Sequence, residues 1–203
     1  MATPIVTDTP LREQVSRVAD ISRQINDNFE QAAQIAIKSG NNEQLTLFRT
    51  RFNSLRNASK DVAFEIVTLL KRFKGIVLTV EEVASREARD AAIEELKYFV
   101  NERYSKSART IMGGFDNLRY DLQEFIAGTS SGDLKEQLRY LVQQASDLKA
   151  VWDKILQETN QFREAIAGAV ETPTNMLLKR RVRLAASVAD VLGASLEVYL
   201  AEI

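Results

Sequence analysis

The densest group of like charges in the chain is the basic segment LLKRRVRLAA at residues 177–186. On a helix, Arg183 shares a face with Lys179, four residues earlier, and with Arg180, three residues earlier. Such a group of cations could bind an anion: a phosphate, a lipid headgroup, nucleic acid or an acidic protein patch. The alternative is structural, because positive charge near a helix start is unfavourable and calls for acidic neighbours. The acidic neighbours we consider are Glu158, Glu164 and Glu171.

A second group of residues combines arginine with tyrosine. The segments NLRYDLQEF at 117–125 and QLRYLVQQA at 137–145 share the pattern L-R-Y-x-x-Q, and they flank the loop-forming GTSSGD almost symmetrically. In a helical hairpin around that loop, Tyr120 would lie near Tyr140 and Arg119 near Arg139. Because arginine and tyrosine are enriched at protein interfaces, these residues could form an interface; the structural alternative is packing onto a third helix.

The chain contains no cysteine and no histidine. This excludes Cys–His and Ser-His-Asp catalysis, zinc sites built from Cys and His, and the di-iron site of four-helix bundles. The acidic pairs Glu81/Glu82 and Glu94/Glu95 are adjacent in sequence, so their side chains diverge on a helix rather than converge on a substrate. We therefore predict no catalytic residues, no cofactor and no metal, and a protein that is not an enzyme.

The overall charge and the N-terminal sequence limit the partners and the location. The formal net charge is −1, which makes nucleic acid an unlikely main partner. The N-terminal MATPIVTDTPLREQ lacks the basic and apolar regions of a signal peptide, and no segment reaches the ~20 apolar residues of a spanning helix. These features predict a cytoplasmic protein without a transmembrane segment.

Apolar residues recur every three or four positions through most of the chain, which predicts helices and no sheet. The fold class we predict is all-α: an elongated bundle of four to six long antiparallel amphipathic helices with coiled-coil-like packing. Residues 1–8 are predicted to form a disordered tail and 9–203 a single domain. The helices are expected at 11–36, 41–74, 80–104, 105–127, 133–170 and 172–199, although the third and fourth could be one helix. Trp152 falls on the apolar stripe of the fifth, where core packing is expected and ligand stacking is the alternative.

Three glycines are candidate hinges. The segment LLKRFKGIVLTVEEVA at 69–84 places Gly75 after a basic cluster, and TVEE then offers a capping box from Thr79 to Glu82. This predicts a joint, in which one helix ends near Lys74 and the next begins after Thr79, or else one kinked helix. Gly113 and Gly114 lie inside the fourth predicted helix, where they predict a kink or a close approach of another helix.

These features lead to three hypotheses about function. The first is a non-catalytic bundle that binds a protein partner or assembles with itself. The second rests on architecture: long rod-like helices resemble the long-helix cytolysins of the ClyA type, which implies membrane activity and anionic lipid as a partner. Those proteins carry an apolar hairpin or tongue, and the nearest segments here, FIAGTSSG and GIVLTV, are short. The third hypothesis is a bundle that carries an apolar ligand.

Overall fold

The computed structural model describes residues 11–37 and 42–203 of the chain. Within these ranges it consists of helices and contains no strand, which confirms the all-α prediction. The predicted tail at 1–8 lies outside the described residues. The helices are α1 (Leu11–Ile37), α2 (Asn42–Glu81), α3 (Arg86–Lys97), the short 3₁₀ helix η1 (Tyr98–Val100), α4 (Arg103–Gly128), α5 (Gly132–Val170) and α6 (Asn175–Glu202).

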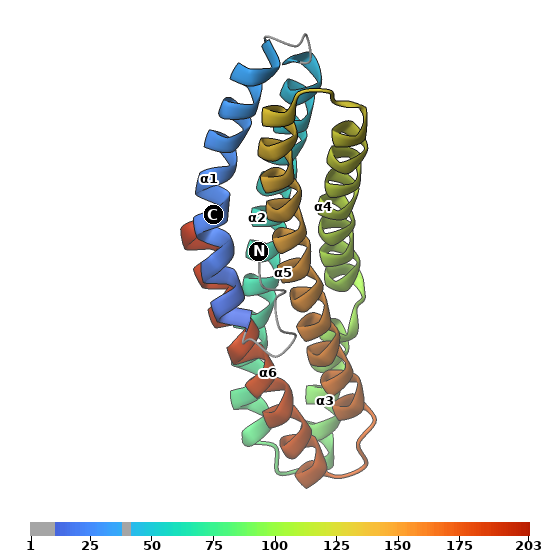
Figure 1. The fold of residues 1–203 in the computed structure, drawn as a ribbon. Helices are drawn as coiled ribbons and strands as arrows, with labels where there is room; N and C mark the ends of the chain where they lie inside the picture. Colours follow the sequence, from blue (N-terminus) through green and yellow to red (C-terminus); the bar gives the residue numbers. More distant parts are fainter. Residues whose placement is uncertain (1–10, 38–41) are drawn as a thin grey trace.

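The long helices lie side by side around a shared core (Figure 1). α5 contacts α1, α3, α4 and α6, and α2 packs against α1, α4 and α6. α3 lies at the opposite end of the bundle from the C-terminal end of α1 (Figure 1). Each long helix therefore buries one face against two or more neighbours, as an amphipathic helix must to hide its apolar stripe.

The core is formed by the apolar stripes, with aromatic side chains stacked along the bundle. Phe52 of α2 contacts Phe29 and Phe115, with ring centroids 6.0 and 6.4 Å away. Further along α2, Phe73 lies edge-on to Phe162 at 5.0 Å. Burial of such a side chain contributes about 1.5–3 kcal/mol, so these contacts hold α2 to its neighbours along its length.

A buried group of three polar residues links α2, α5 and α6. Trp152 is fully buried, and its indole N–H donates to the hydroxyl of Tyr199 at 3.0 Å. Ser59 Oγ lies 2.6 Å from the same hydroxyl and donates its own proton to the carbonyl of Arg56 at 2.7 Å. The Tyr199 hydroxyl therefore accepts from Trp152 and donates to Ser59, so each of these three polar side chains has a hydrogen-bond partner. Trp152 thus has the core role expected of it.

The joint predicted at Gly75 is wrong. α2 continues through Gly75 to Glu81 as a single helix. Glycine inside a helix costs roughly 1 kcal/mol relative to alanine, but Phe73 and Val80 on either side are fully buried, and their burial outweighs that cost. The chain turns after Glu81 instead, and Ser85 caps α3 by accepting from the backbone N–H of Ala88 at 3.1 Å. A capping box at Thr79 is therefore also wrong.

Other helix ends differ from the prediction by a few residues. The break before α4 falls at Asn101, whose side chain accepts from the backbone N–H of Arg103 at 2.8 Å. α5 is capped by Ser131 and α6 by Thr174, each with its side-chain oxygen accepting a backbone N–H three residues later. Periodicity located these helices, but several residues near each end can serve as caps, and only the local backbone selects one.

The glycine pair in α4 does not interrupt the helix, which runs unbroken through both residues. The two positions nevertheless differ. Open space surrounds Gly113, whereas a Cβ atom at Gly114 would meet the side chain of Leu55 on α2. Gly114 therefore allows a close approach of α4 to α2. A hinge role for Gly75, Gly113 or Gly114 stays a prediction.

Candidate functional site

The basic cluster is compensated by α2. The guanidinium of Arg183 forms two hydrogen bonds of 2.6 Å to the carboxylate of Glu81, and Lys179 donates to the Glu81 carbonyl at 2.7 Å. The hydrogen bond from Arg183 holds the pKa of the Glu81 carboxyl below its ordinary value. The acidic neighbour is thus Glu81, which is not among the residues proposed from the sequence. It was missed because the prediction ended α2 at Lys74.

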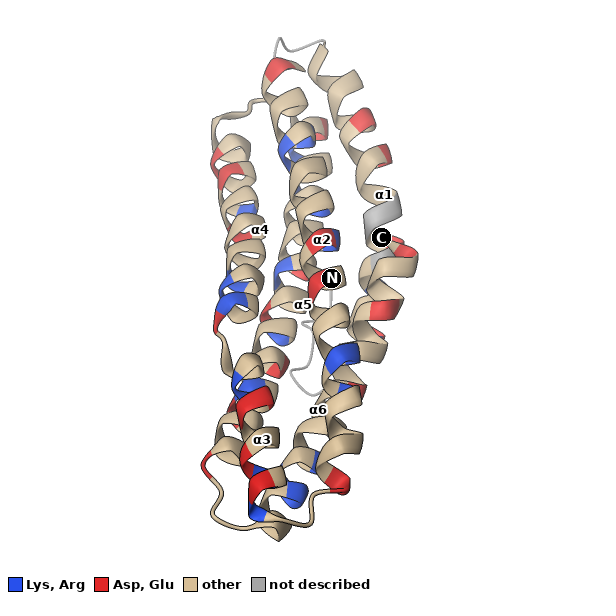
Figure 2. Ribbon diagram, turned by 180° about the vertical axis from the view of Figure 1, so that it is seen from behind, with Lys and Arg blue, Asp and Glu red and all other residues tan. Residues whose placement is uncertain are grey.

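Two further hydrogen bonds hold this end of the bundle together, and each joins a helix to the loop that precedes another helix. Arg89 of α3 donates to the carbonyl of Pro173 at 2.5 Å, and Asn175 donates to the carbonyl of Ala84 at 3.2 Å. Basic and acidic positions are interspersed where α3 meets the start of α6 (Figure 2). Arg180 is exposed and forms no ion pair with any described residue. Of the three cations predicted to bind an anion, Arg183 is paired with a carboxylate, Lys179 is bound to a backbone carbonyl, and Arg180 has neither kind of contact among the described residues.

The paired arginines and tyrosines do not pack onto a third helix. Tyr120 and Tyr140 are 56% and 55% exposed, and within the described ranges no ring contact joins them. Arg119 pairs with Asp116 on its own helix at 2.8 Å, and Arg139 is exposed. Neither ring is therefore buried under a third helix. An interface role for these four residues stays a prediction.

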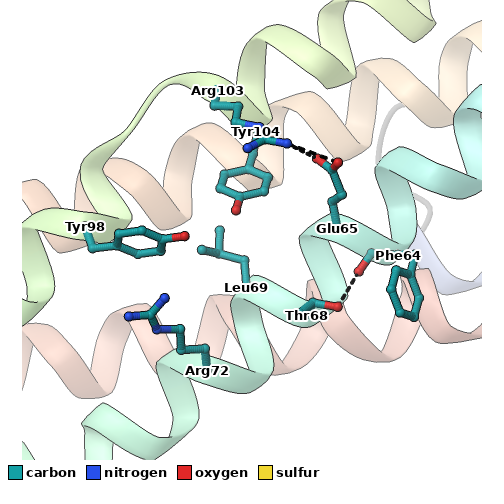
Figure 3. Close-up of a pocket in the computed structure, with 8 residues that line it drawn as sticks. All are labelled: Phe64, Glu65, Thr68, Leu69, Arg72, Tyr98, Arg103 and Tyr104. Atoms are coloured by element: carbon teal, nitrogen blue, oxygen red, sulfur yellow. Dashed lines mark hydrogen bonds and ion pairs between the residues drawn. The ribbon is translucent and has the colours of Figure 1, made fainter.

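A surface pocket of about 250 Å³ lies where α2, η1 and the start of α4 meet (Figure 3). The guanidinium of Arg72 stacks on the ring of Tyr98, 4.3 Å from its centroid. Arg103 instead pairs with Glu65 through hydrogen bonds of 3.1 and 3.2 Å. Tyr104 extends over Leu69 beside Tyr98 (Figure 3). Three separate segments build this pocket, so no sequence motif could have indicated it.

The pocket combines a cation with aromatic and apolar walls. Burial, with a smaller contribution from the Tyr98 hydroxyl, raises the pKa of Tyr104, so this phenol is neutral at physiological pH. Arg72 forms no ion pair among the residues that the structure describes. Its guanidinium, beside aromatic and apolar walls, could bind a carboxylate that carries an apolar group.

A row of exposed apolar residues lies on α6. Leu177, Leu184 and Val191 follow one another at intervals of seven residues and are 37%, 59% and 54% exposed. The neighbouring Met176 is 77% exposed. Both Met176 and Leu177 thus lie outside the core. We call Leu177, Leu184 and Val191 the α6 outer row.

A groove borders the outer row where α1 begins. It has a volume of about 330 Å³ and is lined by Leu11 and Arg12 of α1 and by Asp190, Val191, Ala194 and Ser195 of α6. Most of its lining is apolar or small. The groove therefore extends the outer row sideways and offers a hollow that another apolar side chain could enter.

α6 also meets the length and composition criteria of a membrane-crossing helix. Its most apolar 18-residue window has a mean hydropathy of 1.5, and a third of that window is buried in the bundle. The window contains the acidic residues Asp190 and Glu197, which pair with Lys74 and Lys71 of α2 at 2.7 and 3.0 Å. The sequence analysis expected no such helix.

Charge on α6 changes sign along its length. Its first nine residues contain Lys179, Arg180, Arg181 and Arg183 and no acidic residue. All later charges are acidic: Asp190, Glu197 and Glu202. Among the described residues, no group of acidic side chains could hold a metal ion.

Comparisons with known proteins add no further indication. No protein family matches the chain, no curated protein matches it, and no solved structure matches its fold.

Proposed function

We propose that this protein is a non-catalytic helical bundle that works through its surface, and that its main activity is self-association. The observation that carries the proposal is the α6 outer row, in which Leu177, Leu184 and Val191 leave apolar surface in water at heptad spacing. Apolar residues that recur every seven positions on an exposed helix face are the pattern by which helices pack against each other. Because exposed apolar patches on soluble proteins tend to mark interaction sites, a partner that covers this row is expected.

Sedimentation velocity over a wide range of protein concentrations tests this proposal. A sedimentation coefficient that rises with concentration is the expected result. The matched variants are Leu184→Glu, in the outer row, and Leu78→Glu, at a position on α2 that is 71% exposed. Loss of association in the first variant alone would support the outer row as the contact. A wild-type protein that stays monomeric at every concentration would overturn the proposal.

A second candidate function is membrane binding, and the apolar composition of α6 favours it. Insertion would require Asp190 and Glu197 to leave their lysine partners, and an acidic residue at the centre of a bilayer costs about 2.5–3.5 kcal/mol on insertion scales. Dye release from neutral and anionic vesicles tests it. Release only from anionic vesicles, lost in Arg180→Glu, would assign contact to the basic start of α6, and no release from either would overturn this candidate.

A further inference from the structure

We propose that the α6 outer row is the contact of a two-fold symmetric dimer, in which α6 of a second copy packs antiparallel to α6 of the first. This inference rests on the proposed self-association and specifies its geometry. It names the occupant of the exposed surface as another copy of this chain, with Leu184 at the two-fold axis.

Because the α6 outer row has heptad spacing, another helix is the element that fits against it best. Leu177, Leu184 and Val191 advance along α6 by two turns at a time, so they form a nearly straight ridge over 14 residues, or about 21 Å. A ridge of this kind packs against a second helix that carries the same spacing. The chain itself supplies such a helix in every second copy, and a two-fold interface uses the same surface on both subunits and closes without further growth.

The order of charges on α6 selects the antiparallel orientation. In a parallel pair the basic start of α6, with Arg180 and Arg181, would face the same basic start of the second copy. In an antiparallel pair centred on Leu184, the start of one helix faces the half of the other that carries Asp190. The cations of one copy then come within about one turn of the acidic residue of the other. Opposite charges that flank an apolar contact favour one orientation over the other.

The contact between α2 and α6 shows that this charge order already selects an antiparallel neighbour within one chain. Three ion pairs join the two helices: Lys71 with Glu197, Lys74 with Asp190, and Glu81 with Arg183. Residue numbers rise along α2 while they fall along α6, so the two helices run in opposite directions. In the proposed dimer, the second α6 runs antiparallel to the first along its outer face, as α2 does along an adjacent face.

The groove beside α1 fixes the register. α6 is flanked by the start of α1 near Val191 and Ala194, which limits how far a second helix can extend toward the C-terminus. With Leu184 at the axis, Leu177 of the second copy lies opposite Val191 of the first. Leu177 and the highly exposed Met176 of the second copy are then the apolar side chains that reach the groove. One register thus covers the exposed row and fills the hollow next to it.

Because the chain contains no cysteine, single cysteines allow a direct test on the whole protein. Under mild oxidation Leu184→Cys should form a disulfide-linked dimer, because the two copies of this residue meet at the axis. Leu177→Cys alone and Val191→Cys alone should not, because in each case the two thiols are about 21 Å apart. An equal mixture of those two variants should form the mixed dimer. Leu78→Cys is the exposed control on α2 and should stay monomeric.

The alternative outcomes separate the geometry from the proposed function. A parallel dimer would link Leu177→Cys to itself and give no mixed product, which overturns the orientation but keeps self-association. Concentration-dependent association without a cross-link at Leu184→Cys would overturn the outer row as the interface and keep self-association through another surface. A wild-type monomer in sedimentation would overturn both proposals. For the expected dimer, Leu184→Glu should raise the dissociation constant by at least about a hundredfold, because it places two like charges at the axis.

Discussion

The two faces of α6 differ in what surrounds them more than in what they are made of. The inner face carries Leu192, Leu196 and Tyr199, which are fully buried, and the outer row carries Leu177, Leu184 and Val191, which are more than one-third exposed. Both faces consist mainly of aliphatic residues at helical spacing. Neighbouring helices bury the inner face, whereas no helix among the described residues covers the outer row. Apolar composition alone therefore does not identify a core face.

The largest expected effect on stability comes from truncating a leucine to alanine on the inner face of α6, compared with the same change in the outer row. Leu192→Ala should lower the free energy of unfolding by about 2–5 kcal/mol, because it leaves a cavity between packed helices. Leu184→Ala should change the unfolding of the monomer by no more than about 0.5 kcal/mol, because the side chain already contacts water. Urea denaturation at a low protein concentration measures both. Equal losses would show that the outer row is buried in the folded chain.

The buried hydroxyl on the inner face gives the next effect. Tyr199→Phe should cost about 1–3 kcal/mol, because the indole N–H of Trp152 then lies in the core without an acceptor. Ser59→Ala should cost less, because it leaves Trp152 its acceptor. A double-mutant cycle between Ser59 and Tyr199, followed by thermal unfolding, measures the coupling. An additive pair would mean that their hydrogen bond contributes nothing to stability.

The same hydroxyl predicts a loss of stability at high pH. Burial raises the pKa of Tyr199 from 10.0 to about 12, although its hydrogen bonds with Ser59 and Trp152 oppose this shift. A raised pKa in the folded state means that the contribution is complete below pH 10 and is lost as pH rises toward 12. Thermal unfolding of wild type and Tyr199→Phe across this window isolates the effect, since other tyrosines and lysines titrate equally in both. Parallel profiles would contradict it.

The smallest effect is expected at Gly193, where α6 faces Leu70 of α2. A Cβ atom at Gly193 would lie 3.6 Å from the Leu70 side chain, an ordinary contact distance. Gly193→Ala should therefore stabilise the protein by about 0.5–1 kcal/mol, because alanine loses less conformational entropy in a helix. Gly75→Ala, in open space on α2, is the matched control and should gain a similar amount. A loss at Gly193 alone would show that α6 and α2 pack too closely for a methyl group.

Much of the fold could be predicted from the sequence, and little of the binding surface. The stripe from Leu134 to Ile166 indicated α5 correctly, because burial against several neighbours needs a regular apolar period. The end of α2 could not be predicted in the same way. Gly75 and Thr79 satisfy local rules for a helix end, and only the burial of Val80 in the assembled core overrides them.

For the candidate surfaces, too, the sequence indicated some of the residues and only the fold showed their partners and exposure. The basic segment at 177–186 was visible in the sequence, but its partner Glu81 lies about a hundred residues away and is brought to Arg183 by the fold. The pocket around Arg72 and Tyr98 joins three segments and has no local signature. The exposure of Leu184 and Val191 was likewise invisible, because period and composition do not distinguish a covered row from an uncovered one.

The sequence by itself determined the helical class, the approximate helices and the absence of Cys- or His-based chemistry. Those properties depend on residue identity and on spacing along the chain, which are local. The tertiary structure decided where α2 ends, which carboxylate neutralises Arg183, and which apolar row of α6 stays in water. These depend on which helices become neighbours, and the many weak contacts of the whole core set that arrangement together.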